Sequence, residues 1–270
     1  MFERIKCCLC YPRFIGKFFK DKGSMIFLMI LLFFGVYAVS LGFKTYSSEY
    51  FDDDSVLLVT SCVVQGDKAN ISYDKESGKL SGDSITYAGE GFNVMFFPKE
   101  EDKNIINYDN LSYIAGVNIV FDVDGGHIEL GGIKVSEFYY KDINISDFNI
   151  IDVQNNNAGA VYTFKVLVRA GLLSSNLFFN TYDFTLNLIS DFIMYFVFVL
   201  ISYFFSRGIN NTIDSKIRAK LCFYDNLIYF IVCMVVCLVG IEWLSFIGVL
   251  LPLIYTFVTF RHIVRVQVQR

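Results

Sequence analysis

The sequence predicts an integral membrane protein of the α+β class, with four transmembrane helices and one antiparallel, β-rich domain between the first and second helices. Apolar residues make up 54% of the 270 residues and charged residues only 19%, whereas soluble domains carry about 25% charged residues. The charges are also segregated. Residues 44–183 hold 10 Lys or Arg against 21 Asp or Glu, while residues 1–23 hold 6 against 2. An acidic domain between membrane-spanning segments with basic flanks accounts for both observations.

The first predicted span comprises residues 24–43, which contain no charged side chain. At 1.5 Å per residue, a helix of this length matches a hydrocarbon core of about 30 Å. A cleaved signal peptide is the alternative, because basic residues precede the run and Ala38-Val39-Ser40 resembles a cleavage site. We expect a retained anchor, since both the apolar run and the segment before it are long for a signal peptide.

Three further spans are predicted in the second half of the chain. The second span comprises residues 183–206. Residues 227–260 are then almost continuously apolar, but one helix of that length would be about 51 Å long, well beyond the bilayer core. Two helices over residues 221–241 and 243–260, folded back at Gly240, fit the membrane better.

Basic residues predict the orientation. They are concentrated in a leader of residues 1–23, a loop of residues 207–220 and a tail of residues 261–270. With four spans these three segments lie on one side of the membrane, which the positive-inside rule makes cytoplasmic. Both termini are therefore expected in the cytoplasm, and the domain of residues 44–182 is expected outside the plasma membrane.

The leader is expected to lie on the anionic inner surface of the lipid bilayer as a basic amphipathic segment. Its basic residues are Arg4, Lys6, Arg13, Lys17, Lys20 and Lys22. Cys7, Cys8 and Cys10 are candidates for acylation. The alternative is an unmodified segment at the membrane interface.

The domain outside the membrane is predicted to consist mainly of short strands, because β-branched and aromatic runs alternate with Gly- and Asp-containing turns every 8–12 residues or so. The expected strands are residues 55–64, 70–73, 84–87, 92–97, 117–123, 127–130, 133–135, 143–151 and 161–168. They would form an antiparallel sheet or sandwich, with residues 170–182 leading helically into the second span. Cys62 is the only cysteine in the domain, which excludes an intradomain disulfide, and we expect it to be buried in the first strand.

Candidate binding residues lie in the predicted spans. Asp183, Asn187 and Asp191 are spaced by four and therefore share one helix face. An ionisable group within a span normally faces a partner or a watery cavity, so these residues predict a cation or proton site or a contact with another membrane subunit. The alternative is a helix that begins late, with Asp191 at the interface. Glu242 is a second candidate. The alternative is that it lies in the turn between the third and fourth spans, at the outer surface of the membrane.

Sequence motifs for catalysis or metal binding are scarce. Asp122-Val123-Asp124-Gly125-Gly126-His127 resembles part of a calcium loop, but the third acidic position and the distal Glu are missing. A β-turn explains the same residues, so no metal site is expected beyond this weak candidate at Asp122 and Asp124. His127 and His262 are expected on opposite sides of the membrane. No nucleophile-elbow, zinc-protease or P-loop motif occurs, and we expect no enzyme, no cofactor and no nucleic-acid partner.

Three sequence segments resemble a family of uncharacterised Gram-positive four-span membrane proteins, some of which are called maltodextrin-utilisation proteins. These segments are Tyr11-Pro12-Arg13-Phe14, the stretch IVFDVDGG at residues 119–126, and LLPLIYTFVTFRHIVR at residues 250–265. The resemblance implies an accessory factor, sometimes linked to sugar uptake, and no catalytic residues.

The expected function is therefore that of a non-catalytic accessory or binding subunit of a bacterial membrane assembly. Its outside domain and helices would contact another membrane or envelope protein, with the subunits of an ABC-type sugar importer as candidate partners. The alternative is an oligomeric ion or small-solute transporter or channel with Asp191 in the pathway.

Overall fold

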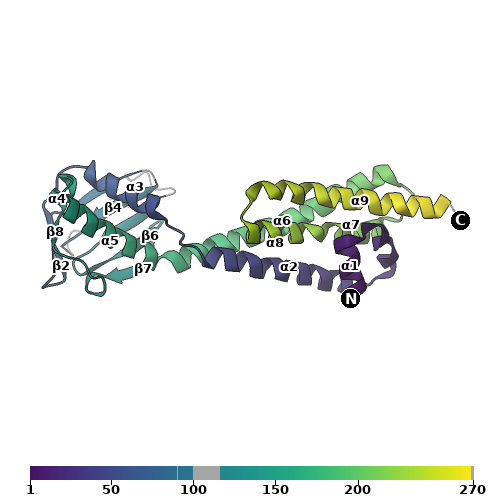
Figure 1. Cartoon of the computed structure of the whole chain (residues 1–270), viewed down its shortest axis with the longest axis horizontal. Coiled ribbons are helices and arrows are strands. Elements are labelled where there is room, and N and C mark those ends of the chain that lie inside the picture. The colour runs from purple at the N-terminus through teal and green to yellow at the C-terminus, as the bar shows by residue number, and fades with distance from the viewer. Residues whose placement is uncertain (90, 100–115, 269–270) are drawn as a thin grey trace. The chain divides into compact units, whose positions relative to one another are not determined.

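The computed structural model describes residues 1–89, 91–99 and 116–268. The chain forms two compact units (Figure 1). The helical unit consists of Met1–Ser48 and Tyr182–Arg270, and the mixed unit consists of Glu49–Thr181.

Among the described residues, four helical segments are long and apolar enough to cross a membrane. They are Gly23–Tyr46 (helix α2), Asn176–Ile209 (α6), Ser215–Val239, and Ser245–Ile263 within α9 (Ser245–Val268). The third is built from α7 (Ser215–Asn226) and α8 (Ile228–Val239). The expectation of four candidate membrane helices with a sheet-containing region between the first two is therefore confirmed.

The long apolar run of the third and fourth segments is interrupted at Gly240. This residue ends α8 in the left-handed conformation, with φ 72°, which glycine adopts without steric penalty. A short 3₁₀ turn (Glu242–Leu244) then leads into α9. The run therefore folds as two helices, as predicted.

The leader folds onto the helical unit through α1 (Phe2–Cys10) and the 3₁₀ segment η1 (Pro12–Lys20). Its side chains Cys8, Ile15 and Phe18 are buried in the core of that unit. Tyr255 of α9 donates a hydrogen bond to Leu9 O at 2.6 Å. The leader is thus an integral part of this unit, although its side chains Phe2 and Phe19 are exposed.

The mixed unit contains two sheets. The larger has the order β3-β4-β5-β6-β7 and the smaller the order β2-β1-β8. Their bounds are β1 Ile71–Asp74, β2 Lys79–Gly82, β3 Ile85–Ala88, β4 Phe92–Phe96, β5 Val117–Phe121, β6 Gly125–Leu130, β7 Ile133–Tyr139 and β8 Phe148–Asn149. Strands β4 and β5 are parallel, whereas the other pairs are antiparallel. The prediction of a purely antiparallel sheet is therefore wrong at this pair.

Two expected strands are helices instead. Residues 55–64 lie in α3 (Asp53–Val64), and residues 161–168 lie in α5 (Ala158–Ser174). Of residues 143–151, only Phe148 and Asn149 form a strand, and α4 (Ile150–Gln154) follows directly. Each long helix begins at a polar cap: Asp52 accepts a hydrogen bond from Ser55 N at 2.9 Å, and Asn157 accepts one from Gly159 N at 3.1 Å. These side chains satisfy backbone donors that an isolated helix leaves free.

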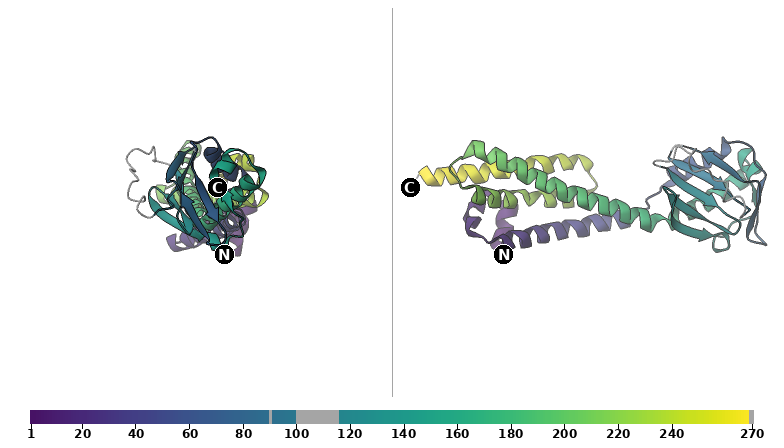
Figure 2. Two further views of the ribbon diagram at one scale, coloured as in Figure 1. Left: turned by 90° about the vertical axis from the view of Figure 1, so that its left-hand side faces the viewer. Right: turned by 180° about the vertical axis from the view of Figure 1, so that it is seen from behind.

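The core of the mixed unit lies between the larger sheet and these two helices. Helices α3 and α5 lie on one face of the sheet (Figure 1), and the view from behind shows the strands from the opposite side (Figure 2). Phe164 of α5 is fully buried, with its ring 6.3 Å from that of Phe96, and 6.1 Å from those of Phe121 and Phe148.

The first and last segments of the mixed unit lie together. The rings of Tyr50 and Phe179 stack with centroids 5.0 Å apart, and Tyr50 N donates to Asn176 Oδ1 at 3.3 Å. The chain therefore enters and leaves this unit at neighbouring points.

Candidate functional site

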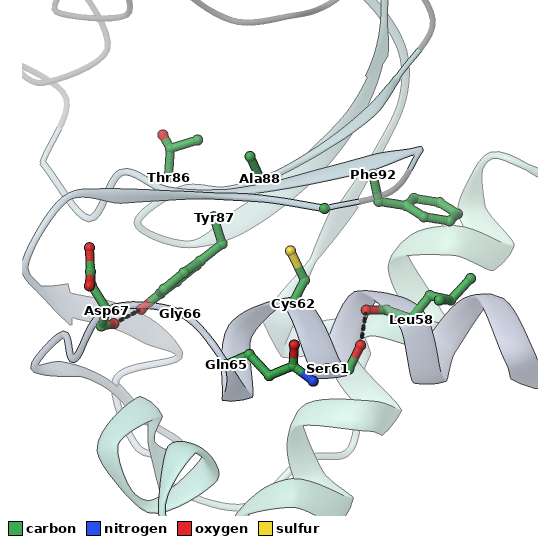
Figure 3. A pocket seen from close by; sticks show the side chains of 11 residues that line it. Leu58, Ser61, Cys62, Gln65, Gly66, Asp67, Thr86, Tyr87, Ala88 and Phe92 are labelled. Carbon is green, nitrogen blue, oxygen red and sulfur yellow. Dashed lines mark hydrogen bonds between the residues drawn. The ribbon is translucent and has the colours of Figure 1, made fainter.

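A groove of about 530 Å³ lies between α3 and β3 (Figure 3). Leu58, Ser61 and Cys62 of α3 form one wall, and Thr86 and Ala88 of β3 contribute to the other. The remaining lining comes from Gln65, Gly66, Asp67, Tyr87, Gly89 and Phe92.

Strand β3 is an edge strand, since among the described residues it pairs with β4 alone. Gly89 N donates to Phe92 O at 2.9 Å at the turn between the two strands. Residues of an antiparallel pair alternate between facing the partner and facing away, so Tyr87 turns its backbone groups toward β4. The N–H and C=O groups of Thr86 and Ala88 then point outward, along the groove. Such a row of backbone groups is a template for another strand.

The loop at the end of the groove is held in place. Tyr87 OH donates to Asp67 O at 3.0 Å, and Gln154 Nε2 donates to the same oxygen at 2.7 Å. Burial raises the pKa of Tyr87 to about 12, so its hydroxyl remains a hydrogen-bond donor. The groove is therefore built on a fixed backbone.

Cys62 does not have the character of a catalytic nucleophile. It is half-buried on a helix, where burial raises the pKa of its thiol, whereas reactive cysteines have depressed pKa values. Its expected place in a strand is wrong, because residues 55–64 form α3. Among the described residues, the lining of the groove brings together no acid–base pair.

The structure places two of the three evenly spaced polar residues of α6 in one groove. Asn187 and Asp191 line an open cavity of about 560 Å³ together with Lys44, whereas Asp183 is half-buried outside it. This cavity lies within the helical unit.

The carboxylate of Asp191 joins three helices. Tyr229 of α8 donates to its Oδ1 at 2.7 Å, and Tyr37 of α2 donates to its Oδ2. Both oxygens thus accept a hydrogen bond from a tyrosine hydroxyl of a neighbouring helix. Tyr37 lies about 21 Å along α2 from Gly23, well inside that span. The side chain of Glu242 lies outside the described residues, and its backbone lies in the 3₁₀ turn before α9.

Asp122 and His127 meet across the turn between β5 and β6. His127 Nδ1 lies 3.0 Å from Asp122 Oδ2, and its Nε2 lies 3.1 Å from Glu129 Oε1. A neutral imidazole has one N–H, so donation to both carboxylates requires the protonated ring. Burial lowers the pKa of His127, but the two carboxylates outweigh it and raise this pKa to about 9.

The calcium-like segment forms this turn, with Asp122 N donating to Gly125 O at 2.7 Å. Asp124 lies in the same turn. The described residues contain no cluster of three His, Cys, Asp or Glu side chains placed to hold a metal.

Sequence reasoning missed a buried polar cluster at the junction of α7 and α9. Asp225 is fully buried, and Thr259 Oγ1 lies 2.7 Å from its Oδ1 and 2.9 Å from Pro12 O. The signal was present, because Asp225 is an ionisable residue within the predicted third span. Sequence reasoning also missed the α3–β3 groove, because the groove exists only if residues 55–64 form a helix.

No family model, curated protein or solved structure matches this chain. Membership of the Gram-positive family therefore stays a prediction that rests on the three sequence segments at residues 11–14, 119–126 and 250–265.

Proposed function

We propose that this protein is a non-catalytic binding subunit of a membrane assembly, and that its α3–β3 groove binds an extended segment of a partner protein as an additional strand. The observation that carries the proposal is the outward-facing backbone of Thr86 and Ala88 along the groove. Strand addition of this kind obtains affinity from main-chain hydrogen bonds and specificity from neighbouring side chains.

The groove also indicates the character of the partner segment. Leu58 is 50% exposed on the α3 wall, which offers an apolar contact, and Asp67 carries a carboxylate at one end. Residues 44–183 hold 21 acidic against 10 basic residues. The preferred segment is therefore basic or neutral, since an acidic one would be repelled.

Co-purification from native membranes in mild detergent, with mass spectrometry of the bound proteins, tests the proposal. Thr86→Pro removes an outward N–H, which an edge strand tolerates, and Thr86→Val keeps it. Recovery of a stoichiometric partner by the wild type and Thr86→Val, but not by Thr86→Pro, is expected. Subunits of an ABC-type sugar importer are the first candidates. Equal recovery by both variants contradicts strand addition, and a chain that always emerges alone contradicts the binding role.

The proposal includes an orientation, with both termini in the cytoplasm and the mixed unit outside. It is supported by the three basic segments next to the predicted spans, two of which meet where Lys220 Nζ donates to Asp21 O at 2.7 Å. Membrane-impermeant thiol labelling of intact cells tests it. Ser77→Cys, in the exposed turn after β1, should react, and the exposed Cys10 of the leader should not. The opposite pattern reverses the orientation.

The second candidate function is conduction of an ion or small solute. It is favoured by the open cavity that Asp191, Asn187 and Lys44 line within the helical unit. Flux through vesicles reconstituted with the protein should then be abolished by Asp191→Asn. Unchanged flux removes this function, and recovery of a homo-oligomer without other proteins would favour it.

A further inference from the structure

The leader and two helix ends enclose a second groove, of about 670 Å³, in the helical unit. One side is η1, which contributes Arg13, Phe14 and Lys17. The other side comes from the α6–α7 connection and the start of α7, and His262 and Ile263 of α9 complete the lining. The groove thus lies where the chain enters or leaves three of the membrane-spanning segments.

One face of this groove is cationic. The Arg13 guanidinium lies 4.7 Å and the Lys17 ammonium 4.6 Å from the centroid of the Phe14 ring. The imidazole of His262 meets the same ring edge-on at 6.2 Å. Three nitrogen-bearing side chains are therefore gathered around one aromatic ring.

The two cations Arg13 and Lys17 have no ion-pair partner among the described residues. Both are exposed. The acidic residue of the lining is Asp214, whose carboxylate caps α7 by accepting hydrogen bonds from Lys216 N at 2.9 Å and Ile217 N at 3.4 Å. An external anion is therefore the complement of this face.

The opposite face is apolar and fixed. Ile213, Ile217 and Ile263 line it. The buried guanidinium of Arg218 donates to Asn210 O at 2.9 Å and to Ile213 O at 3.1 Å, which holds the α6–α7 connection in place. A small inorganic anion would leave these isoleucines uncovered, whereas an acyl chain would cover them.

The location matches that of a lipid headgroup. The fourth span predicted from the sequence ends at residue 260, just before His262, the third candidate span begins at Ser215, and the first begins at Gly23, just after η1. Basic pockets between helices at this level are suited to acidic lipid headgroups. Long basic side chains there reach the phosphates while their stems lie along apolar surface.

We propose that this groove binds one anionic glycerophospholipid, with its phosphate between Arg13, Lys17 and His262 and an acyl chain along Ile217 and Ile263. The lipid fastens the leader to α7 and α9. The site is separate from the α3–β3 groove and does not depend on the proposed partner.

Native mass spectrometry of the delipidated full chain in detergent tests this site. The probes are phosphatidylglycerol, phosphatidylcholine with the same acyl chains, and soluble glycerol phosphate. The wild type should retain one phosphatidylglycerol at a concentration about tenfold or more below that needed for phosphatidylcholine. Glycerol phosphate should not displace it at equal concentration, because it lacks the acyl chain.

Two double variants with the same change in charge separate this site from general attraction. Arg13→Gln with Lys17→Gln removes the cationic face and should weaken phosphatidylglycerol retention about tenfold or more. Lys6→Gln with Lys22→Gln alters two exposed leader residues outside the lining and should leave retention unchanged. The melting temperatures of both variants should match the wild type.

Three results would overturn the proposal. Equal losses in the two double variants would indicate diffuse charge attraction. Equal retention of phosphatidylglycerol and phosphatidylcholine would exclude recognition of the anionic headgroup. Displacement by equimolar glycerol phosphate would show a site for soluble phosphate esters instead of a lipid.

Discussion

Replacing His127 with Gln removes a positive charge that two carboxylates share. The side chain of His127 is only 15% exposed, and its two nitrogens face Asp122 and Glu129 at 3.0 and 3.1 Å. A glutamine amide can still donate to one of these carboxylates, but it has no charge and does not titrate. The mixed unit of the variant should therefore lose stability near neutral pH.

The pKa of His127 gives the size of the effect and its pH range. This pKa is raised from 6.5 to about 9 in the folded protein. A group with a raised folded-state pKa contributes stability that is fully present below its unfolded pKa and is lost as the pH rises through its folded pKa. The protonated ring thus contributes about 2.5 kcal/mol at pH 7 and almost nothing at pH 9.5.

Pulse proteolysis in urea measures this difference on the full chain in detergent, by following cleavage within residues 49–181. Tryptophan fluorescence would not serve, because the single tryptophan, Trp243, lies in the helical unit. With a denaturant slope of about 1–3 kcal/mol per molar urea, the midpoint of His127→Gln should fall about 1 M below that of the wild type at pH 7. At pH 9.5 the two midpoints should converge.

Glu137→Gln is the matched control. Glu137 lies opposite His127 on β7, but it is exposed and accepts a hydrogen bond from Lys134 instead. This variant should show the pH dependence of the wild type. If the urea midpoints of the wild type and His127→Gln differ by the same amount at pH 7 and pH 9.5, His127 is neutral in the folded protein. That result would contradict the shared positive charge.

Three further predictions concern the two cores and a helix cap. Phe164→Ala should destabilise the mixed unit by about 3–5 kcal/mol, because its ring is fully buried among other rings; pulse proteolysis should detect it, and a loss below 1 kcal/mol would contradict this packing. Asp52→Ala should cost the same unit about 1 kcal/mol through loss of the α3 cap, and Asp52→Asn, which keeps an acceptor, should cost less in the same assay. Asp225→Asn should keep the melting temperature of the helical unit in detergent near that of the wild type, because its amide can donate to the Thr259 hydroxyl while that hydroxyl donates to Pro12 O. Asp225→Leu should lower it by several degrees, and equal melting of the two variants would show that this hydrogen bond contributes nothing.

The membrane helices were predictable because their signal is local and strong. A span requires a long run of apolar residues, and residues 24–43 form such a run without a charged side chain. The break at Gly240 followed from length alone, since one helix over residues 227–260 would be too long. Gly240 then supplies the left-handed residue that such a break needs.

Residues 55–64 and 161–168 of the mixed unit were expected as strands but are helices. Two physical causes account for this: contacts of each segment with the core, and a polar residue that caps the start of each helix. Residues 55–64 hold four Val and one Thr, β-branched residues that favour strands, but contacts with the rest of the core and a polar cap make them helical. The cap was visible in the sequence, since Asp52 is followed three residues later by Ser55 and then by an apolar run. Asn157 marks the start of α5 in the same way.

The α3–β3 groove could not be predicted, because it depends on topology instead of local pattern. It requires β3 to lie at the edge of the larger sheet, where it pairs with β4 alone among the described strands. It also requires α3 to be a helix. The hydrogen bonds to Asp191 were partly predictable. The sequence indicated that this carboxylate needs a partner, but not that Tyr37 and Tyr229 are the donors.

Contacts between segments that lie far apart in the sequence determine the order in which the parts of this chain can form during synthesis. Strand β1 pairs with β8 across more than seventy residues of chain, so the smaller sheet can close only after Asn149 has been synthesised. Helix α2 is finished long before Asp191 exists to accept the hydrogen bond of Tyr37. At about 5–20 residues per second, α2 waits roughly 7–30 s for Asp191 of α6, with the Tyr37 hydroxyl facing lipid or the insertion machinery. The first helix must therefore hold its place in the bilayer by its own apolar length, and the helical unit assembles last.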